Sequence, residues 1–352
     1  MTIPWSGSSI VAIEGTRTVQ KLKKILRAKN LKFLIKVETS DNPVDYSKYE
    51  RIRNDIWGFP EDNLSGTRNL MCENVLFDGS ALFIAVYREA EAGGFVEDDE
   101  QLIGFSYGFV GVRDKALAFR SPGNLQFYSQ YTAIRDDFRG YGLGVRIKEF
   151  QRDLVRGWFG IGVITCTFDP LTGVNALRNI HYFGMDVVEY QVATYGEFGG
   201  LLNRADVSSD RFLVSWDLEK PAGQPGRAGI AAVHIERQSV VRIRNIIVAG
   251  RSRPVEIETV DGLNLGAQGG VLAVPIPRDF YLMLRETDVG EPEVRRIPID
   301  WRLATRAAFQ MLFRKGYRVI DFVPAGGPVK TNYYLLKKDE RRKPEAPRRR
   351  QS

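Results

Sequence analysis

The stretch that decides the fold is Asp137-Phe138-Arg139-Gly140-Tyr141-Gly142-Leu143-Gly144-Val145. Residues 127–134 before it are rich in aromatic and β-branched side chains, which favours a strand. After it, apolar residues recur at the helical period, and the polar positions between them are Arg146, Lys148, Glu149 and Arg152. Glycine permits a tight turn and close approach of a ligand, and the first turn of a helix offers free N–H groups. The sequence therefore predicts a cradle for an anion such as phosphate.

The glycine spacing excludes the two commoner phosphate loops. A Walker loop ends in Gly-Lys-Ser/Thr, whereas Gly144 is followed by Val145 and Arg146. A dinucleotide fingerprint needs a further glycine three residues after the second, and Val145 or Ile147 stands there. The pattern that does fit is R-x-x-G-x-G, formed by Arg139, Gly142 and Gly144.

This pattern resembles the acyl-CoA pyrophosphate loop of the GNAT superfamily of N-acyltransferases, in which successive backbone amides hold the diphosphate. The resemblance extends to the following elements: a strand candidate at 161–168, turn residues at 169–173, and a helix near Asn175 that ends at Gly184. More narrowly, three stretches are similar to a two-domain branch of predicted GNAT acyltransferases: Trp57-Gly58-Phe59-Pro60, Thr167-Phe168-Asp169-Pro170-Leu171 and Asn175-Ala176. The likeness covers residues 31–220 and continues more weakly to residue 337.

The resemblance implies an α/β (α+β) fold, with a mixed, mostly antiparallel sheet, flanking helices and a smaller α+β C-terminal domain. It also implies acetyl-CoA, or another acyl-CoA such as succinyl-CoA, as the donor in a direct transfer to an amine within a ternary complex. The strand before the loop, here residues 130–134, would hold the pantetheine arm and the thioester carbonyl through its backbone. The residues implied for donor binding are Ala133, Ile134, Arg139, Gly140, Tyr141, Gly142, Leu143, Gly144, Val145 and Asn175. Ordinary helix-start chemistry explains Asn175 equally well.

Residues that could transfer protons are fewer. Many members of the superfamily place a tyrosine acid four residues before the helix-ending glycine, and Ile180 occupies that position here. Tyr182 lies about 200° around the helix from Ile180, so it cannot simply replace the missing tyrosine. Either Tyr182 is a packing residue or the acid is another group. His181 is a candidate base or a structural histidine. Asp169 either orients the acceptor amine from the end of its strand or caps the next helix as an Asp-Pro turn residue.

The acceptor that we expect is a small-molecule amine such as an amino acid. Tyr128 and Gln130, on the strand before the loop, are the candidates for binding it. Because side chains alternate along a strand, only some of Tyr128, Ser129 and Gln130 point into the pocket. Two other functions stay open: a catalytically inactive acyl-CoA-binding regulatory protein, which the missing tyrosine would explain, and a protein- or RNA-directed acetyltransferase.

The composition is that of a folded enzyme with two domains. The chain has 352 residues, of which 43% are hydrophobic and 26% charged, so a sizeable core can form. No apolar run reaches the length of a membrane span, and the first residues lack a secretion signal. Cys72 and Cys166 are too few for a disulfide framework, and the two histidines, His181 and His234, are far apart in sequence. We therefore expect a cytoplasmic protein without a metal.

Composition and pattern divide the chain into five segments. They are an N-terminal helical extension (1–30, with a helix at 16–29 docked through its apolar side), the donor-binding catalytic domain (31–220), a linker (221–228), a smaller α+β domain (229–337) and a disordered basic tail (338–352). From Lys337 to Ser352, eight basic and three acidic residues give +5 of the chain's net +7. Because the excess charge lies in this solvated tail, nucleic acid is not an expected partner.

Propensity and periodicity place the other elements. The predicted strands are 31–37, 82–87, 102–110, 212–218, 231–235, 255–260, 271–275, 317–323 and 332–336, and the predicted helices are 46–57 and 301–315. The acidic connector 88–101 is expected to be an exposed, mobile loop.

One pattern occurs in both halves. Residues 307–322 repeat the helix, glycine, strand order of residues 175–190. The smaller domain is either a degenerate GNAT-like half or contains a common helix-to-strand unit. Because it lacks an R-x-x-G-x-G loop, we assign it no donor, and its expected role is to cover the acceptor pocket or to supply a homodimer surface.

Overall fold

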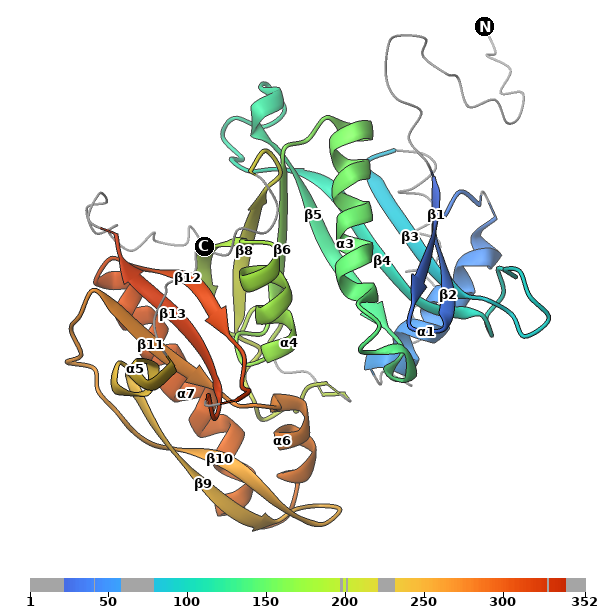
Figure 1. Ribbon diagram of the computed structural model, residues 1–352. Helices are drawn as coiled ribbons and strands as arrows, with labels where there is room; N and C mark the ends of the chain where they lie inside the picture. The colour runs from blue at the N-terminus through green and yellow to red at the C-terminus, as the bar shows by residue number, and fades with distance from the viewer. Residues whose placement is uncertain are drawn as a thin grey trace, which may run out of the picture.

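The computed structural model describes residues 22–40, 42–57, 79–196, 199–200, 202–220, 232–327 and 329–339. The first part forms one large sheet with helices on both faces, and the second forms two small sheets beside a long helix (Figure 1). The predicted fold class, a mixed and mostly antiparallel sheet with flanking helices followed by a smaller α+β part, is confirmed.

The large sheet contains eight strands in the order β1-β2-β3-β4-β5-β6-β8-β7. All neighbouring strands run antiparallel except β5 and β6, which run parallel. The strands are β1 (Lys23–Ala28), β2 (Leu31–Val37), β3 (Ala81–Arg88), β4 (Leu102–Val112), β5 (Leu125–Ile134), β6 (Val163–Phe168), β7 (Asp186–Gln191) and β8 (Arg211–Asp217).

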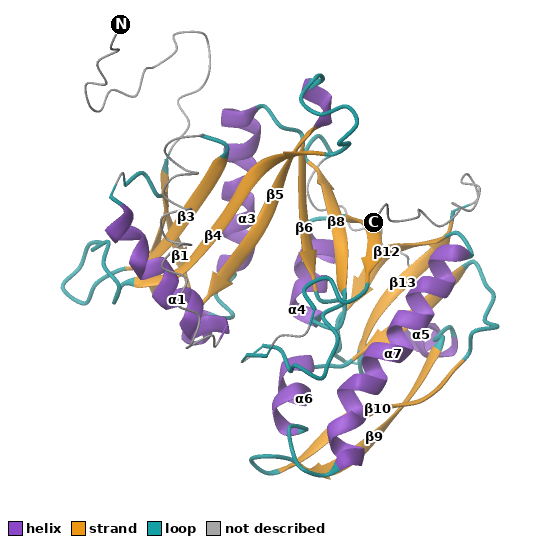
Figure 2. Cartoon of the chain, turned by 180° about the vertical axis from the view of Figure 1, so that it is seen from behind, coloured by secondary structure: helices purple, strands orange, loops and turns teal. Residues whose placement is uncertain are grey.

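Helices cover both faces of this sheet. Helix α3 lies in front of the sheet in Figure 1, and α1 lies in front of it in Figure 2, the view from behind. The helices of this part are α1 (Ser47–Trp57), α3 (Leu143–Leu154) and α4 (Gly173–Ala176), with the π-helical turns η4 (Val155–Phe159) and η5 (Leu177–Tyr182) and the short 3-10 turns η1 (Pro43–Tyr46), η2 (Pro122–Asn124) and η3 (Asp136–Phe138). α3, α4 and η5 share one hydrophobic core, and α1 packs on a second, aromatic-rich cluster.

The C-terminal part is built round helix α7. A hairpin of β9 and β10 and a three-stranded sheet in the order β11-β13-β12 pack against it. Its elements are α5 (Ala232–Arg237), β9 (Val241–Ala249), β10 (Pro254–Leu263), β11 (Val271–Ile276), α6 (Phe280–Glu286), α7 (Pro292–Arg314), β12 (Tyr317–Val323) and β13 (Asn332–Lys338).

The two parts share one core. Phe212 of β8 packs edge-on against Phe309 of α7, with ring centroids 4.8 Å apart, and against Tyr334 of β13 at 5.5 Å. Phe309 and Tyr334 in turn contact each other at 5.3 Å. Three aromatic rings from three elements therefore join the large sheet to the C-terminal part.

Most of the predicted elements are confirmed within a few residues. These are the strands at 31–37, 82–87, 102–110, 161–168, 212–218, 255–260, 271–275, 317–323 and 332–336, and the helices at 46–57, near 175 and at 301–315. The repeated order of helix, glycine and strand is present, since Gly184 and Gly316 both have positive φ after a helix. The linker and the part of the basic tail after residue 339 lie outside the described residues, and Lys338, assigned to the disordered tail, is the last residue of strand β13.

The predicted N-terminal helix at 16–29 is wrong over its described portion. Lys23–Ala28 is strand β1, which forms an antiparallel hairpin with β2 through a turn at Lys29, whose φ is 53°. Leu26 and Ala28 pack on the core, whereas Ile25 is 59% exposed. The residues that face the core, Leu22, Leu26 and Ala28, thus follow the two-residue period of a strand, and Ile25 lies on the opposite face.

Two further expectations in the C-terminal part need correction. The strand predicted at 231–235 is helix α5 where the structure describes it, and strand β9 was not predicted. Helix α7 begins nine residues earlier than expected, at Pro292, and includes Pro298. β9 alternates apolar residues and arginines only over residues 241–244 and is apolar only over residues 246–249, so neither strand pattern extends along its whole length.

The acidic connector after β3 is largely exposed, as predicted. Two of its carboxylates form ion pairs, Glu97 with Lys36 at 2.5 Å and Asp99 with Arg51. Among the described residues, every helix is too short or too polar to cross a membrane.

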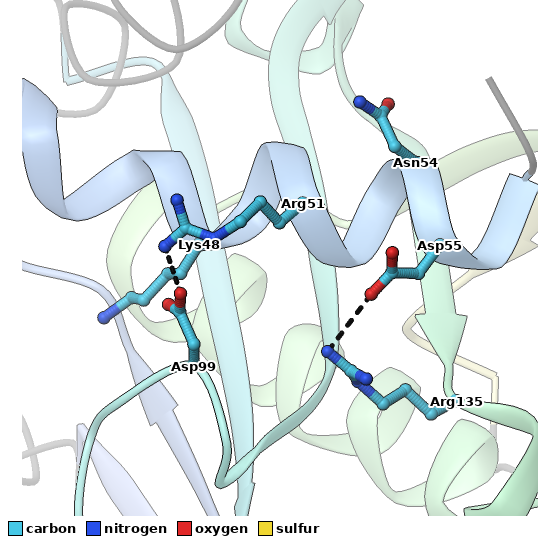
Figure 3. A pocket seen from close by; sticks show the side chains of 6 residues that line it. All are labelled: Lys48, Arg51, Asn54, Asp55, Asp99 and Arg135. Carbon is cyan, nitrogen blue, oxygen red and sulfur yellow. Dashed lines mark hydrogen bonds and ion pairs between the residues drawn. The ribbon is translucent and has the colours of Figure 1, made fainter. Parts of the chain in front are cut away.

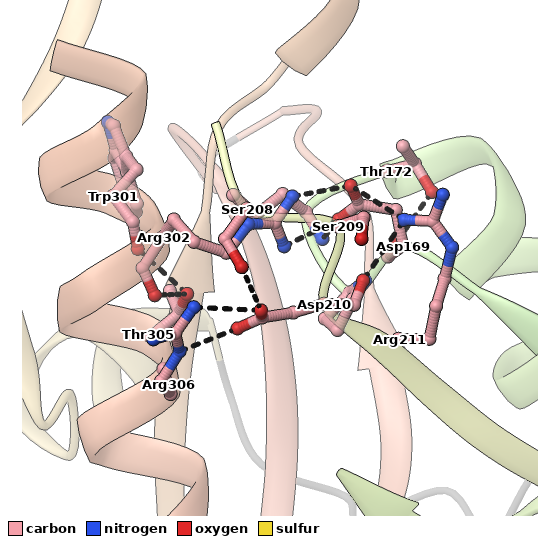
Figure 4. A network of polar contacts seen from close by, with 12 residues as sticks. Asp169, Thr172, Ser208, Ser209, Asp210, Arg211, Trp301, Arg302, Thr305 and Arg306 are labelled. Atoms are coloured by element: carbon pink, nitrogen blue, oxygen red, sulfur yellow. Dashed lines mark hydrogen bonds and ion pairs between the residues drawn. The ribbon is translucent and has the colours of Figure 1, made fainter. Parts of the chain in front are cut away.

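Helix α7 is fixed to the large sheet by two arginine–aspartate pairs one turn apart (Figure 4). Arg302 donates to both oxygens of Asp169, at 2.8 and 2.5 Å, and Arg306 donates to both oxygens of Asp210, at 2.8 Å each. Burial opposes the charge of Asp210, but hydrogen bonds from Arg306 and Tyr190 keep the pKa of its carboxyl below the usual value. Both carboxylates are therefore structural anchors.

Replacing Arg302 with methionine should lower the free energy of unfolding by about 3 kcal/mol, because Asp169 would keep only the more distant Arg211, at 3.4 Å, to compensate its buried charge. Urea denaturation measures this change. The matched control is Arg296→Met on the same helix, whose arginine is 69% exposed and pairs with Asp300. Arg296→Met should change the midpoint of urea denaturation little. Equal changes of the midpoint in the two variants would contradict the prediction.

Candidate functional site

Strands β5 and β6 part almost as soon as they meet. They are paired at only two positions, Phe127 with Ile164 and Tyr128 with Thr165. We call the second position the vertex. Beyond it, residues 129–134 of β5, except Gln130, remain paired with β4 but leave an open backbone edge toward β6. At about 3.3 Å per residue, this open edge is roughly 17–20 Å long.

A β-bulge marks the start of the open edge. Tyr107 and Gly108 of β4 pair with Tyr131 and Ser129, so Gln130 is an extra residue without a partner in β4. A bulge bends its strand and increases the local twist, which turns β5 away from β6. Gln130, a predicted acceptor-binding residue, is exposed at this bend.

The predicted anion cradle lies at the far end of the open edge. Gly140 and Gly142 have φ values of 78° and 73°, and a Cβ at either position would meet no atom within 4 Å. Gly142 is the N-cap of α3 and supplies no side-chain hydrogen bond to the first turn. The N–H groups of Val145 and Arg146 donate to the Gly142 carbonyl, whereas those of Leu143 and Gly144 have no acceptor among the described residues and are available to an anion.

Arg178 is a cradle residue that the sequence analysis missed. Its guanidinium lies over the first turn of α3, because a Cβ on Gly144 would be 3.3 Å from its Nη1. Asn175 accepts from Arg178 Nη2 at 2.9 Å and Asn179 accepts from its Nε at 3.2 Å. Asn175, predicted to bind the donor, thus orients the arginine. The sequence feature that could have identified Arg178 is its position one helical turn after Asn175, in the helix after β6.

The other predicted donor-binding side chains point into the protein or solvent. Arg139 is half exposed and pairs with Asp136 at 2.7 Å. Tyr141 packs edge-on against Phe33 at 5.6 Å, under the Lys29 ammonium. Leu143 and Ala133 are buried, and Ile134 and Val145 pack on the core or its edge. Their predicted role through backbone groups stays a prediction.

The three predicted catalytic side chains lie away from the vertex and are engaged elsewhere. The Asp169 carboxylate accepts from Arg302, Arg211 and the N–H of Leu171, which supports the turn interpretation. His181 Nδ1 lies 2.8 Å from Asp321 Oδ1 of β12, and Tyr182 donates to Glu149 at 2.9 Å. Ile180, at the position of the expected tyrosine, is buried in the core. Each of the three candidates therefore has a partner side chain in this structure, and its predicted catalytic role stays a prediction.

Hydroxyl groups gather on the α1 side of the vertex. Thr167 Oγ1 lies 3.0 Å from the Tyr195 hydroxyl, and the Tyr128 hydroxyl is 3.4 and 3.5 Å from these two groups. Burial, opposed by the hydrogen bond to Thr167, raises the pKa of Tyr128. Thr165 Oγ1 is buried without a hydrogen-bond partner among the described residues. Tyr128 was predicted here, whereas Thr165, Thr167 and Tyr195 were not.

Lys148, on the opposite side of the vertex, is the least expected feature. The sequence placed it on the polar side of α3, but only 2% of it is exposed. Its Nζ donates to Ser129 Oγ at 2.5 Å and to Gln151 Oε1 at 3.3 Å. Burial lowers the pKa of Lys148 to about 8, with Cys166 opposing the shift and Arg178 adding to it. A buried lysine thus faces the point where β5 and β6 part.

A polar pocket of about 320 Å³ lies elsewhere, between α1, the acidic connector and the end of β5 (Figure 3). Its charged side chains pair across it, Arg135 with Asp55 at 3.3 Å and Arg51 with Asp99. Arg135 follows β5 five residues after Gln130, roughly 17 Å along an extended chain. The pocket is therefore distant from the vertex.

No family model and no curated protein match the sequence. Among solved structures, the chain is similar to Arabidopsis thaliana NAA60 in complex with acetyl-CoA, with 16% identity, a TM-score of 0.40, and coverage of 53% of this chain and 99% of that one. It is also similar to the ribosomal-protein-S5-alanine acetyltransferase of Vibrio fischeri (14% identity, TM-score 0.39, coverage 56% and 100%). A third similar structure is described as a GNAT-family acetyltransferase from Desulfovibrio desulfuricans, with 14% identity, a TM-score of 0.35, and coverage of 52% of this chain and 99% of that one.

Replacing Arg178 with glutamine should raise the Kd for inorganic pyrophosphate about tenfold, because a hydrogen bond to a charged group contributes about 1.5–3 kcal/mol. Isothermal titration calorimetry measures the affinity. Arg156→Gln is the matched control, since Arg156 is 52% exposed and pairs with Glu219. The same affinity in both variants would show that Arg178 is not part of an anion site.

Proposed function

We propose that this chain is an acyl-CoA-dependent N-acyltransferase. It moves an acetyl or succinyl group from CoA to the amine of a small molecule such as an amino acid, by direct transfer in a ternary complex. The observation that carries the proposal is the combination of an anion cradle at one end of the open edge with a closed vertex at the other.

The acyl donor fits this arrangement at both ends. Its diphosphate suits the first turn of α3 and Arg178, where free N–H groups and a cation converge. Its pantetheine arm carries amides, which can pair with the unpaired backbone groups of residues 129–134 as an added strand would. The thioester then lies at the vertex, where β5 and β6 close the site.

The acceptor reaches the thioester from the α1 side. Tyr128, Thr167 and Tyr195 form the hydroxyl cluster there, and Tyr195 stacks against Arg211 with 5.2 Å between guanidinium and ring centroid. Tyr195 belongs to the loop after β7, so this loop closes one side of the acceptor face. This polar cluster beside the vertex supports a small amine as the acceptor.

The chemistry is attack of a neutral amine on the thioester carbon. Backbone N–H groups of the open edge can polarise the carbonyl oxygen, on which negative charge develops. The tetrahedral intermediate then expels the CoA thiolate, and both the attacking nitrogen and the leaving sulfur require proton transfer.

The direct test is release of CoA thiol from acetyl-CoA and succinyl-CoA in the presence of a panel of amines and amino acids. We expect turnover with intersecting initial-rate lines, because both substrates must be bound before transfer. Tight binding of CoA without turnover across the panel would instead indicate an inactive acyl-CoA-binding protein. Acylation of peptides alone would point to a protein acceptor.

Replacing Gly144 with valine should reduce CoA affinity at least tenfold with little change in the unfolding midpoint. The new side chain would enter the space between α3 and Arg178, where a Cβ is already 3.3 Å from Nη1. Gly111→Val in β4 is the control, since its Cβ would meet no atom within 4 Å. Unchanged CoA affinity in a folded Gly144→Val protein would contradict the donor site.

A further inference from the structure

Ser129 and Lys148 form a hydrogen-bonded pair directly beside the vertex. Ser129 is the first residue of the open edge, one position after the last paired residue of β5. Its side chain lies on the α3 side, where Lys148 Nζ donates to its Oγ at 2.5 Å. Both residues are buried, at 3% and 2% exposure. A group that reaches the end of the open edge therefore meets Ser129 first and Lys148 behind it.

The hydrogen-bond pattern fixes which atoms donate. Gln151 accepts from Lys148 through Oε1, and its Nε2 donates to Ser106 Oγ at 3.1 Å. Ser106 in turn donates to the carbonyl of Tyr131 at 2.9 Å. Lys148 is thus surrounded by acceptors, and two of the three N–H donors of its ammonium are used. The hydroxyl hydrogen of Ser129 has no acceptor among the described residues, so it is free to be donated at the vertex.

We propose, on the basis of the N-acyltransferase function above, that Ser129 and Lys148 form a proton relay to the leaving CoA thiolate. When the carbon–sulfur bond breaks, the sulfur takes the hydroxyl proton of Ser129, and Ser129 takes a proton from the Lys148 ammonium. Lys148 is left as a neutral amine with two N–H groups, which still satisfy Ser129 and Gln151. Before the next turnover, solvent returns one proton to the Lys148 amine. The acceptor nitrogen releases one proton to solvent, so the reaction consumes no net proton.

The surroundings of Lys148 suit this task. The charged and titratable groups that face it are Cys166 of β6 and Arg178 of η5, and neither is a carboxylate. Its pKa of about 8 lies close to that of a thiol, near 8.5, so the proton can move in either direction at small cost. The ammonium fraction falls as the pH rises through this value, so turnover should fall on the alkaline side.

A binding experiment tests the relay without any acceptor. The ultraviolet absorbance of the thiolate gives the pKa of the thiol of CoA bound to wild type, Ser129→Ala, Lys148→Met and the exposed control Lys115→Met. An ammonium close to the sulfur should hold the thiol pKa about 1 pH unit lower in wild type and Lys115→Met than in Lys148→Met. Equal thiol pKa values in all four proteins would overturn the relay while leaving the donor site intact. Failure of wild type to bind CoA would overturn the N-acyltransferase function itself.

Kinetics supply the second measurement. Ser129→Ala and Lys148→Met should each lower kcat about a hundredfold with little change in KM for the donor. In Lys148→Met, the fall of kcat above about pH 8 that wild type shows should be absent. The double variant should be no slower than either single variant, because the two residues act as one unit. Additive losses, or an alkaline limb that survives in Lys148→Met, would overturn the relay.

The same proteins distinguish a nucleophilic serine. If Ser129 attacked the thioester, mass spectrometry would show an acylated serine and a burst of thiol without acceptor, which would also overturn the relay. The denaturation midpoint of Lys148→Met should equal or exceed that of wild type, since methionine replaces a buried cation that lacks a carboxylate partner.

Discussion

The early separation of β5 from β6 is the constraint on which the rest of the structure depends. Two paired positions hold these parallel strands together, and the bulge at Gln130 then turns β5 away. An interrupted sheet leaves backbone donors and acceptors without partners, and a protein tolerates this only where another group or solvent satisfies them. The cradle of α3, the hydroxyl cluster and Lys148 are all arranged round this opening.

The C-terminal part helps to keep β5 and β6 apart, because helix α7 holds the ends of neighbouring strands. β6 ends at Phe168, and the next residue, Asp169, is held by Arg302 of α7. One turn further along α7, Arg306 holds Asp210 at the start of β8. The carboxyl end of β6 is therefore fixed to the C-terminal part and away from β5. This gives α7 a structural role that neither a cover for the acceptor pocket nor a dimer surface requires.

The sequence predicted the cradle and most of the strands because their signals are local, whereas the mixed sheet was implied by the GNAT resemblance. Glycines with positive φ, alternating apolar residues and helix periodicity depend on neighbours in the chain, and Gly140 and Gly142 behave as expected. The rest depends on tertiary contacts. From the sequence, Lys148 is a polar residue of a helix, and only the structure shows that Ser129 and Gln151 surround it. The sequence also leaves Asp169 open between an acceptor-orienting and a turn role, because its partner Arg302 lies far along the chain. The N-terminal strand was misread because Leu22 and Leu26, four residues apart, lie on one face of a helix and also on one face of a strand.

Amide hydrogen exchange with and without CoA tests the central claim most directly, since it reports on the backbone of the open edge itself. CoA should slow exchange in residues 129–134 and in the first turn of α3, and should leave the β9–β10 hairpin unchanged. Binding of CoA without added protection in either segment would contradict the claim that the separation of β5 and β6 is the donor site.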